Sequence, residues 1–211
     1  MKQVQKLQQL NNLSYFDTNT VAQLTGLEGN NLYKNIIRWL KQGALIKLKR
    51  GVYTTDSYFK QLDDKNTYLE FITNKLRYPS YLSLEYVLSK GQVLTETVYS
   101  YTAITQKTTR AYSNELGTFS YRNISDKLFT GFKIIKKNGF EIAIASKAKA
   151  LFDYIYLKMF RKSLITIEML NDLRLNLEEF TKEDAGEFSK YCELSNIQKY
   201  KNLPYLLFPK K

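Results

Sequence analysis

Hydrophobic and polar positions repeat at helical spacing between Asn30 and Lys41. Leu32, Ile36, Trp39 and Leu40 recur every three or four residues, which predicts an amphipathic helix with one buried stripe. Asn30 is suited to the N-cap, and Gly43 stands where the residue after a helix needs a positive φ. The opposite stripe is polar, so its side chains share one face: Asn31, Lys34, Asn35, Arg38 and Lys41.

A short basic hairpin is predicted directly after this helix. In the first strand, polar and apolar residues alternate until Gly51 allows a turn, and Val52 and Tyr53 begin the return strand. The alternation predicts that Leu45, Lys47 and Lys49 point one way, and that Ile46, Leu48 and Arg50 point the other.

Two further helices are expected upstream. Thr18 to Leu24 is typical of a short capped helix that ends at Gly26, and Met1 to Leu13 supplies a preceding helix. A short helix, a turn, a longer helix and a basic hairpin are the order of a winged helix-turn-helix. We therefore predict such a domain over residues 1–56. The same pattern would also suit an ordinary three-helix bundle.

The remaining residues, 57–211, predict a second domain of mixed α/β type. A linker helix is expected over 57–76, and it ends before Tyr78-Pro79. Asn138-Gly139 is a strong hairpin signal. Period-two segments predict an antiparallel sheet from Val98–Ile104, Gly117–Arg122, Phe129–Lys136 and Phe140–Ala145. Helices follow, capped by Ser146, near Thr166 and at Thr181. The predicted fold class is therefore α+β.

Charge is concentrated near the N-terminus. The chain has 211 residues and a net charge of +12, and residues 1–60 carry nine Lys/Arg against three Asp/Glu. This gradient indicates a basic head that contacts nucleic acid. The single Cys192 excludes an internal disulfide and, with no long apolar run, predicts a cytoplasmic protein that does not enter the membrane.

The sequence lacks the residues of most catalytic and metal sites. There is no histidine, which removes imidazole catalysis, and one cysteine cannot supply a zinc site. No phosphate-binding glycine loop is found. We therefore predict no catalytic residues, no metal and no cofactor. An acidic nuclease-like site would have to rest on Glu141 and Lys147, whose spacing is unsuited to it.

The polar helix face and the hairpin supply the predicted DNA contacts. Asn pairs with base edges, while Lys and Arg reach guanine or phosphate. The candidate contacts are Asn31, Lys34, Asn35, Arg38, Lys41, Lys47, Lys49, Arg50 and Tyr53.

Three segments in order resemble the AbiEi antitoxin family. The first is Arg38 to Tyr53 (RWLKQGALIKLKRGVY), the second Tyr81 to Gly91 (YLSLEYVLSKG), and the third Ala143 to Asp153 (AIASKAKALFD). Tyr86-Val87 and Lys147-Ala148 depart from the family pattern. Lys149 and Asp153, four residues apart, are expected to pair.

The resemblance implies an antitoxin that binds inverted repeats in its own promoter as an autorepressor. Its C-terminal domain would counteract a nucleotidyltransferase-type toxin. Two alternatives remain open: a winged-helix regulator with a ligand-sensing or dimerisation domain, and an enzyme acting on nucleic acid.

Overall fold

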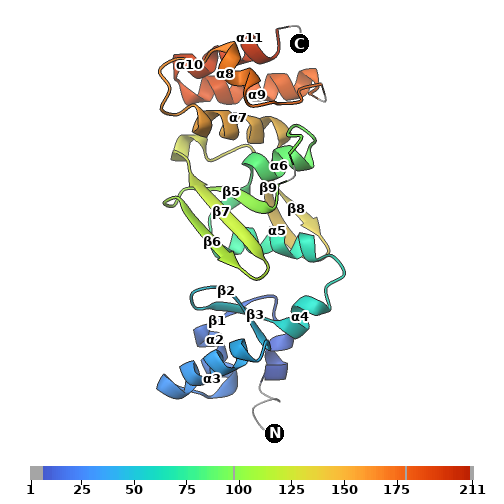
Figure 1. The fold of residues 1–211 in the computed structure, drawn as a ribbon, viewed down its shortest axis with the longest axis vertical. Coiled ribbons are helices and arrows are strands. Elements are labelled where there is room, and N and C mark those ends of the chain that lie inside the picture. Colours follow the sequence, from blue (N-terminus) through green and yellow to red (C-terminus); the bar gives the residue numbers. More distant parts are fainter. Residues whose placement is uncertain (1–6, 97, 179, 210–211) are drawn as a thin grey trace. The chain divides into compact units, whose positions relative to one another are not determined.

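The computed structural model describes residues 7–96, 98–178 and 180–209 and shows an α+β protein (Figure 1). The described residues form two compact units. The first contains the residues up to Leu69 together with Tyr112–Thr118, and the second contains Glu70–Ala111 and the residues from Phe119 onward.

The first unit combines short helices with a three-stranded antiparallel sheet in the order β1-β3-β2. Strand β1 pairs Phe16 with Tyr53 and was not predicted, because two residues show no periodicity. The elements are η1 (Gln9–Asn12), β1 (Phe16–Asp17), α2 (Thr18–Thr25), α3 (Gly29–Lys41), β2 (Leu45–Lys49), β3 (Val52–Thr55) and α4 (Asp56–Lys60).

The predicted helix over Thr18–Leu24 is confirmed as α2. The Asp17 carboxylate accepts a hydrogen bond from the Thr20 amide (2.8 Å), and Gly26 ends the helix with a φ of 63°. The Thr20 amide bond lowers the pKa of Asp17. Of the predicted first helix, residues 1–6 lie outside the described residues, and the described part ends in the 3-10 turn η1.

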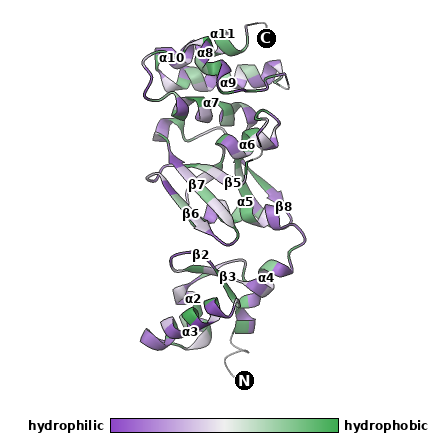
Figure 2. Ribbon diagram, viewed as in Figure 1, coloured by the Kyte–Doolittle hydropathy of each residue, from purple (hydrophilic) through white to green (hydrophobic). Residues whose placement is uncertain are grey.

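Helix α3 begins two residues earlier than the sequence suggests. Asn30 is not its N-cap, because the Glu28 carbonyl already accepts from the Leu32 amide (3.2 Å) and Glu28 is the capping residue. Gly43 has the expected positive φ, 69°. Leu32, Ile36 and Trp39 are buried as predicted. Figure 2 shows hydrophilic and hydrophobic residues sharing the turns of α3.

The hairpin β2–β3 forms, and Leu45 packs in a hydrophobic cluster with Tyr53 that does not include Ile46 and Leu48, but both of its faces are partly buried. Leu45, Ile46 and Leu48 are all buried, so successive side chains do not alternate between core and solvent. The pairing shifts between Lys47 and Lys49, which is a β-bulge. The segment Tyr112–Thr118 of the same unit also covers β2, since the Asn114 side-chain amide donates to the Leu48 carbonyl (2.8 Å).

One hydrophobic cluster holds the helices of the first unit on its sheet. It joins η1, α2 and α3 to all three strands and excludes water from their apolar faces. Its buried members are Leu10, Phe16, Val21, Leu32, Ile36, Trp39, Leu45 and Tyr53.

The single linker helix that we predicted over 57–76 is wrong. The chain forms α4, and then α5 (Lys65–Leu76), separated by residues 61–64. Asp64 accounts for the break, because its carboxylate accepts from the amide and the hydroxyl of Thr67 at 2.9 and 2.6 Å. Such a bond fixes a helix start and competes with continuation from α4.

A six-stranded mixed sheet in the order β6-β7-β5-β4-β9-β8 lies mostly in the second unit, and the tip of its β6–β7 hairpin, Tyr112–Thr118, is the part that belongs to the first. The predicted antiparallel sheet is therefore wrong, because the observed sheet is mixed: β4 and β9 run parallel and pair Leu82 with Ile144. The strands are β4 (Ser80–Leu82), β5 (Ser100–Thr105), β6 (Arg110–Asn114), β7 (Gly117–Asn123), β8 (Phe132–Lys137) and β9 (Phe140–Ala145).

The β8–β9 hairpin is confirmed at its predicted turn. Asn138 and Gly139 have φ values of 48° and 79°, so both adopt the left-handed region that a two-residue hairpin turn needs. Lys137 pairs with Phe140 across it.

Helices cover the sheet and extend beyond it. Helix α7 (Lys147–Lys158) lies between the sheet and the C-terminal helices (Figure 1), and residues 148–156 are all buried. Ser146 caps α7 and Thr181 opens α9 with a capping box, as predicted. The other elements of this unit are α6 (Leu84–Lys90), η2 (Asp126–Leu128), α8 (Ile167–Asn171), α9 (Lys182–Ser195), α10 (Gln198–Lys201) and α11 (Leu203–Leu207). Among the described residues, no helix combines the length and apolar character needed to cross a membrane.

Candidate nucleic-acid interface

The outward face of α3 carries the predicted polar residues. Asn31, Lys34, Arg38 and Lys41 are exposed, and Asn35 is half-buried. They lie opposite the stripe that holds Trp39 in the core, so the amphipathic pattern places three cations on one accessible surface.

Three of these side chains are already connected. The Asn35 amide donates to the Asn31 carbonyl (2.7 Å), and its oxygen accepts from the Arg38 guanidinium. Asn35 therefore holds Arg38 in one orientation. A bidentate contact from Asn35 to an adenine would require Arg38 to release it.

The hairpin presents fewer candidate contacts than the sequence suggests. Lys47 and Arg50 are exposed, with Arg50 at the turn. Lys49 is half-buried, and its Nζ lies 5.8 Å from the centre of the Tyr112 ring of the same unit. Tyr53 is only 7% exposed and packs in the core beside Phe16. Tyr53 is therefore part of the core of the first unit and not of its exposed surface.

Two apolar side chains on α3 were missed by the sequence reasoning. Tyr33 and Ile37 are 58% and 52% exposed, although both are large and hydrophobic. They are four residues apart, so they form one patch beside the polar face. The sequence does contain a signal that could have identified them, because neither Tyr33 nor Ile37 belongs to the predicted buried stripe of the helix.

In the second unit, the two other segments that carry the family resemblance meet in a buried polar network. Lys149 Nζ lies 2.6 Å from Asp153 Oδ1, which confirms the predicted pair, and both side chains are fully buried. Asp153 Oδ2 accepts from the hydroxyls of Tyr81 (3.0 Å) and Ser83 (2.8 Å). Because Ser83 bonds to Asp153, its hydroxyl does not cap α6. The network has no solvent access and holds α7 to β4.

The residues considered for a nuclease-like site do not come together. Lys147 pairs with Asp184 at 2.9 Å, while Glu141 lies 3.4 Å from Lys136 on the exposed β8–β9 hairpin. Within the described ranges, no three His, Cys, Asp or Glu residues are grouped so that they could hold a metal ion.

The comparisons with known proteins identify no relative from which a role could be transferred to these residues. No protein-family model matches the chain, and no curated protein matches it.

Proposed function

We propose that the first unit is a winged helix-turn-helix that binds double-stranded DNA, with α3 in the major groove and the β2–β3 hairpin on the phosphate backbone. The observation that carries this proposal is the placement of five exposed cations on α3 and the directly following hairpin. They are Lys34, Arg38, Lys41, Lys47 and Arg50.

The chemistry of this surface fits the two kinds of contact that DNA offers. Arg38, fixed by Asn35, can bond the two acceptors of a guanine edge, whereas the hairpin cations can reach phosphates without reading sequence. Ile37 and Tyr33 add apolar surface beside the polar stripe, which suits contact with a thymine methyl group. Lys49 and Tyr53 are left out of the proposed surface because Lys49 is half-buried and Tyr53 is buried.

The cellular role that we propose is that of an autorepressing antitoxin acting on a nucleotidyltransferase-type toxin. It rests on the resemblance to the AbiEi family. The Tyr81–Gly91 and Ala143–Asp153 segments support it, since they share one buried network and thus form a common structural core. Growth arrest by the product of an adjacent gene, relieved by co-expression of this chain, would support this role.

The test of DNA binding is a mobility-shift titration on the DNA upstream of its own gene, repeated at several salt concentrations. With Arg38 on a base edge, Lys34, Lys41, Lys47 and Arg50 are left for phosphate, and four phosphate contacts give a log–log salt slope of about −3.6. We expect Lys47→Ala with Arg50→Ala to reduce that slope by about 2 and to weaken all DNA sequences alike. Arg38→Ala should instead relax preference at about one base pair, at a cost of roughly 1–3 kcal/mol.

The matched control is Lys60→Ala. Lys60 is an exposed cation of the same unit that pairs with Asp56 on α4 and belongs to neither α3 nor the hairpin. Its removal should leave the slope nearly unchanged. A slope that falls equally in the control and in the hairpin variant would refute the proposed surface.

A second candidate function is a DNA-binding regulator whose second unit senses a small ligand. The observation that favours it is a pocket in that unit that is lined by both charged and apolar side chains.

A further inference from the structure

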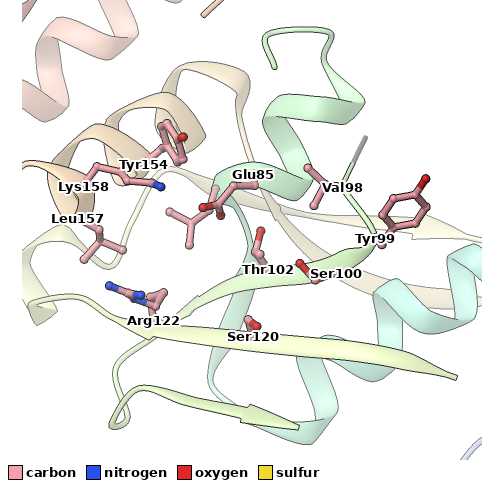
Figure 3. Close-up of a pocket in the computed structure, with 11 residues that line it drawn as sticks. Glu85, Val98, Tyr99, Ser100, Thr102, Ser120, Arg122, Tyr154, Leu157 and Lys158 are labelled. Carbon is pink, nitrogen blue, oxygen red and sulfur yellow. The ribbon is translucent and has the colours of Figure 1, made fainter. Parts of the chain in front are cut away.

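The second unit contains an open pocket of about 540 Å³ between α6, α7 and the strands β5 and β7 (Figure 3). This size is typical of pockets that hold small molecules. Arg122, Leu157 and Lys158 lie together on one side, Glu85 comes from α6, and Ser100 and Ser120 line the strands.

The charged side chains of the pocket are little used to hold the fold, apart from Lys158, whose Nζ lies 5.3 Å from the centre of the Tyr154 ring. Among the described residues, Arg122, Lys158 and Glu85 have no side-chain hydrogen bond or ion pair. Lys147 of the same unit, by contrast, pairs with Asp184 at 2.9 Å. Thr102 is also occupied: its hydroxyl donates to the Ser83 carbonyl (2.7 Å) and accepts from the Tyr86 amide (3.0 Å).

The pocket therefore offers two cations, one carboxylate and the hydroxyls of Ser100 and Ser120. Tyr154 adds a buried aromatic wall, and its pKa is raised by burial and then by the charges of Glu85 and Glu96, so its hydroxyl stays protonated at neutral pH. Two cations match the charge of a phosphomonoester, which is close to −2 at pH 7. A carboxylate matches an N–H or O–H donor.

We propose that this pocket binds a small phosphomonoester that also carries an amine or hydroxyl group. Arg122 and Lys158 hold the phosphate and Glu85 accepts from the donor. A phosphomonoester is chosen over a carboxylate because its two charges balance both cations. The site does not depend on DNA binding by the first unit.

The experiment is an NMR titration of the full, ¹⁵N-labelled chain with phosphoethanolamine, which joins a phosphate to an amine. Inorganic phosphate and ethanolamine test each half alone, and glycerophosphoethanolamine tests the lipid-type diester. We expect shifts at Ser100, Ser120, Arg122 and Lys158, with phosphoethanolamine the tightest of the four. Arg122→Gln and Lys158→Gln should each weaken it about ten-fold.

Two further variants separate the roles. Glu85→Gln should remove the advantage of phosphoethanolamine over inorganic phosphate while keeping phosphate binding. Lys133→Gln, which removes an exposed cation on β8 outside the pocket, should bind as the native chain does. The absence of shifts at the pocket residues would overturn the proposal, as would equal binding by the diester. The proposal would also be overturned if the Arg122→Gln and Lys158→Gln variants both bound phosphoethanolamine as tightly as the Lys133→Gln control.

Discussion

At the scale of single residues, the second unit depends on a charge pair placed where water cannot reach it. Lys149 is held by Asp153 and also donates to the Leu128 carbonyl (2.8 Å), so its ammonium group has two protein acceptors in place of water. A buried charge that loses its partner is far more costly than a broken surface pair, because its desolvation is no longer offset. Spacing predicted this pair, but its burial and its bonds to Tyr81 and Ser83 depend on distant segments.

We expect Asp153→Asn to lower the free energy of unfolding of the second unit by about 3–5 kcal/mol, because it leaves the Lys149 charge buried without a counter-ion. Urea titration followed by labelling of Cys192, a buried residue of the same unit, measures this. Adding Lys149→Met should recover part of the loss. The control is Lys136→Ala, which breaks an exposed pair with Glu141 and should cost less than about 1 kcal/mol. If Asp153→Asn lowers the free energy of unfolding by no more than this control does, the buried pair stabilises the unit no more than an exposed pair.

At the scale of elements, the sequence predicts what local chemistry determines. The Asn138-Gly139 turn, the Thr181 capping box and the buried stripe of α3 follow from a few adjacent residues. Strand β4 could not be predicted, since its three residues show no period and its parallel pairing with β9 joins positions 62 residues apart. The pocket residues Glu85, Arg122 and Lys158 share no motif, because they come from α6, β7 and α7 and meet only in the folded unit.

The same chemical change should have opposite effects in a turn and in a helix. Gly139→Ala places a Cβ at a φ of 79° and should destabilise the second unit by about 1 kcal/mol, although no atom lies within 4 Å of that Cβ. Gly186→Ala, within α9 and also with open space, should stabilise it by about 0.5–1 kcal/mol, because alanine loses less backbone entropy. Cys192 labelling in urea compares the two. Equal effects would show that backbone conformation does not decide these positions.

At the scale of the whole molecule, the chain contains two units, each with its own buried residues and its own natural probe. Trp39, the only tryptophan, is 3% exposed in the cluster of the first unit. Cys192, the only cysteine, is fully buried in the second, where burial raises the pKa of its thiol. Native protein should therefore resist thiol reagents even in mildly alkaline buffer, and labelling should follow unfolding of that unit.

These two probes test whether the units unfold independently. A protein with two cores is not required to unfold in one step. Ile36→Val removes a methylene beside Trp39 in the first core and should lower the stability of that unit by about 0.5–1.5 kcal/mol. We expect it to move the urea midpoint of Trp39 fluorescence and to leave that of Cys192 labelling in place, while Asp153→Asn does the reverse. If both midpoints move together in both variants, the chain unfolds as one cooperative body, and the free energies assigned to the second unit then belong to the whole protein.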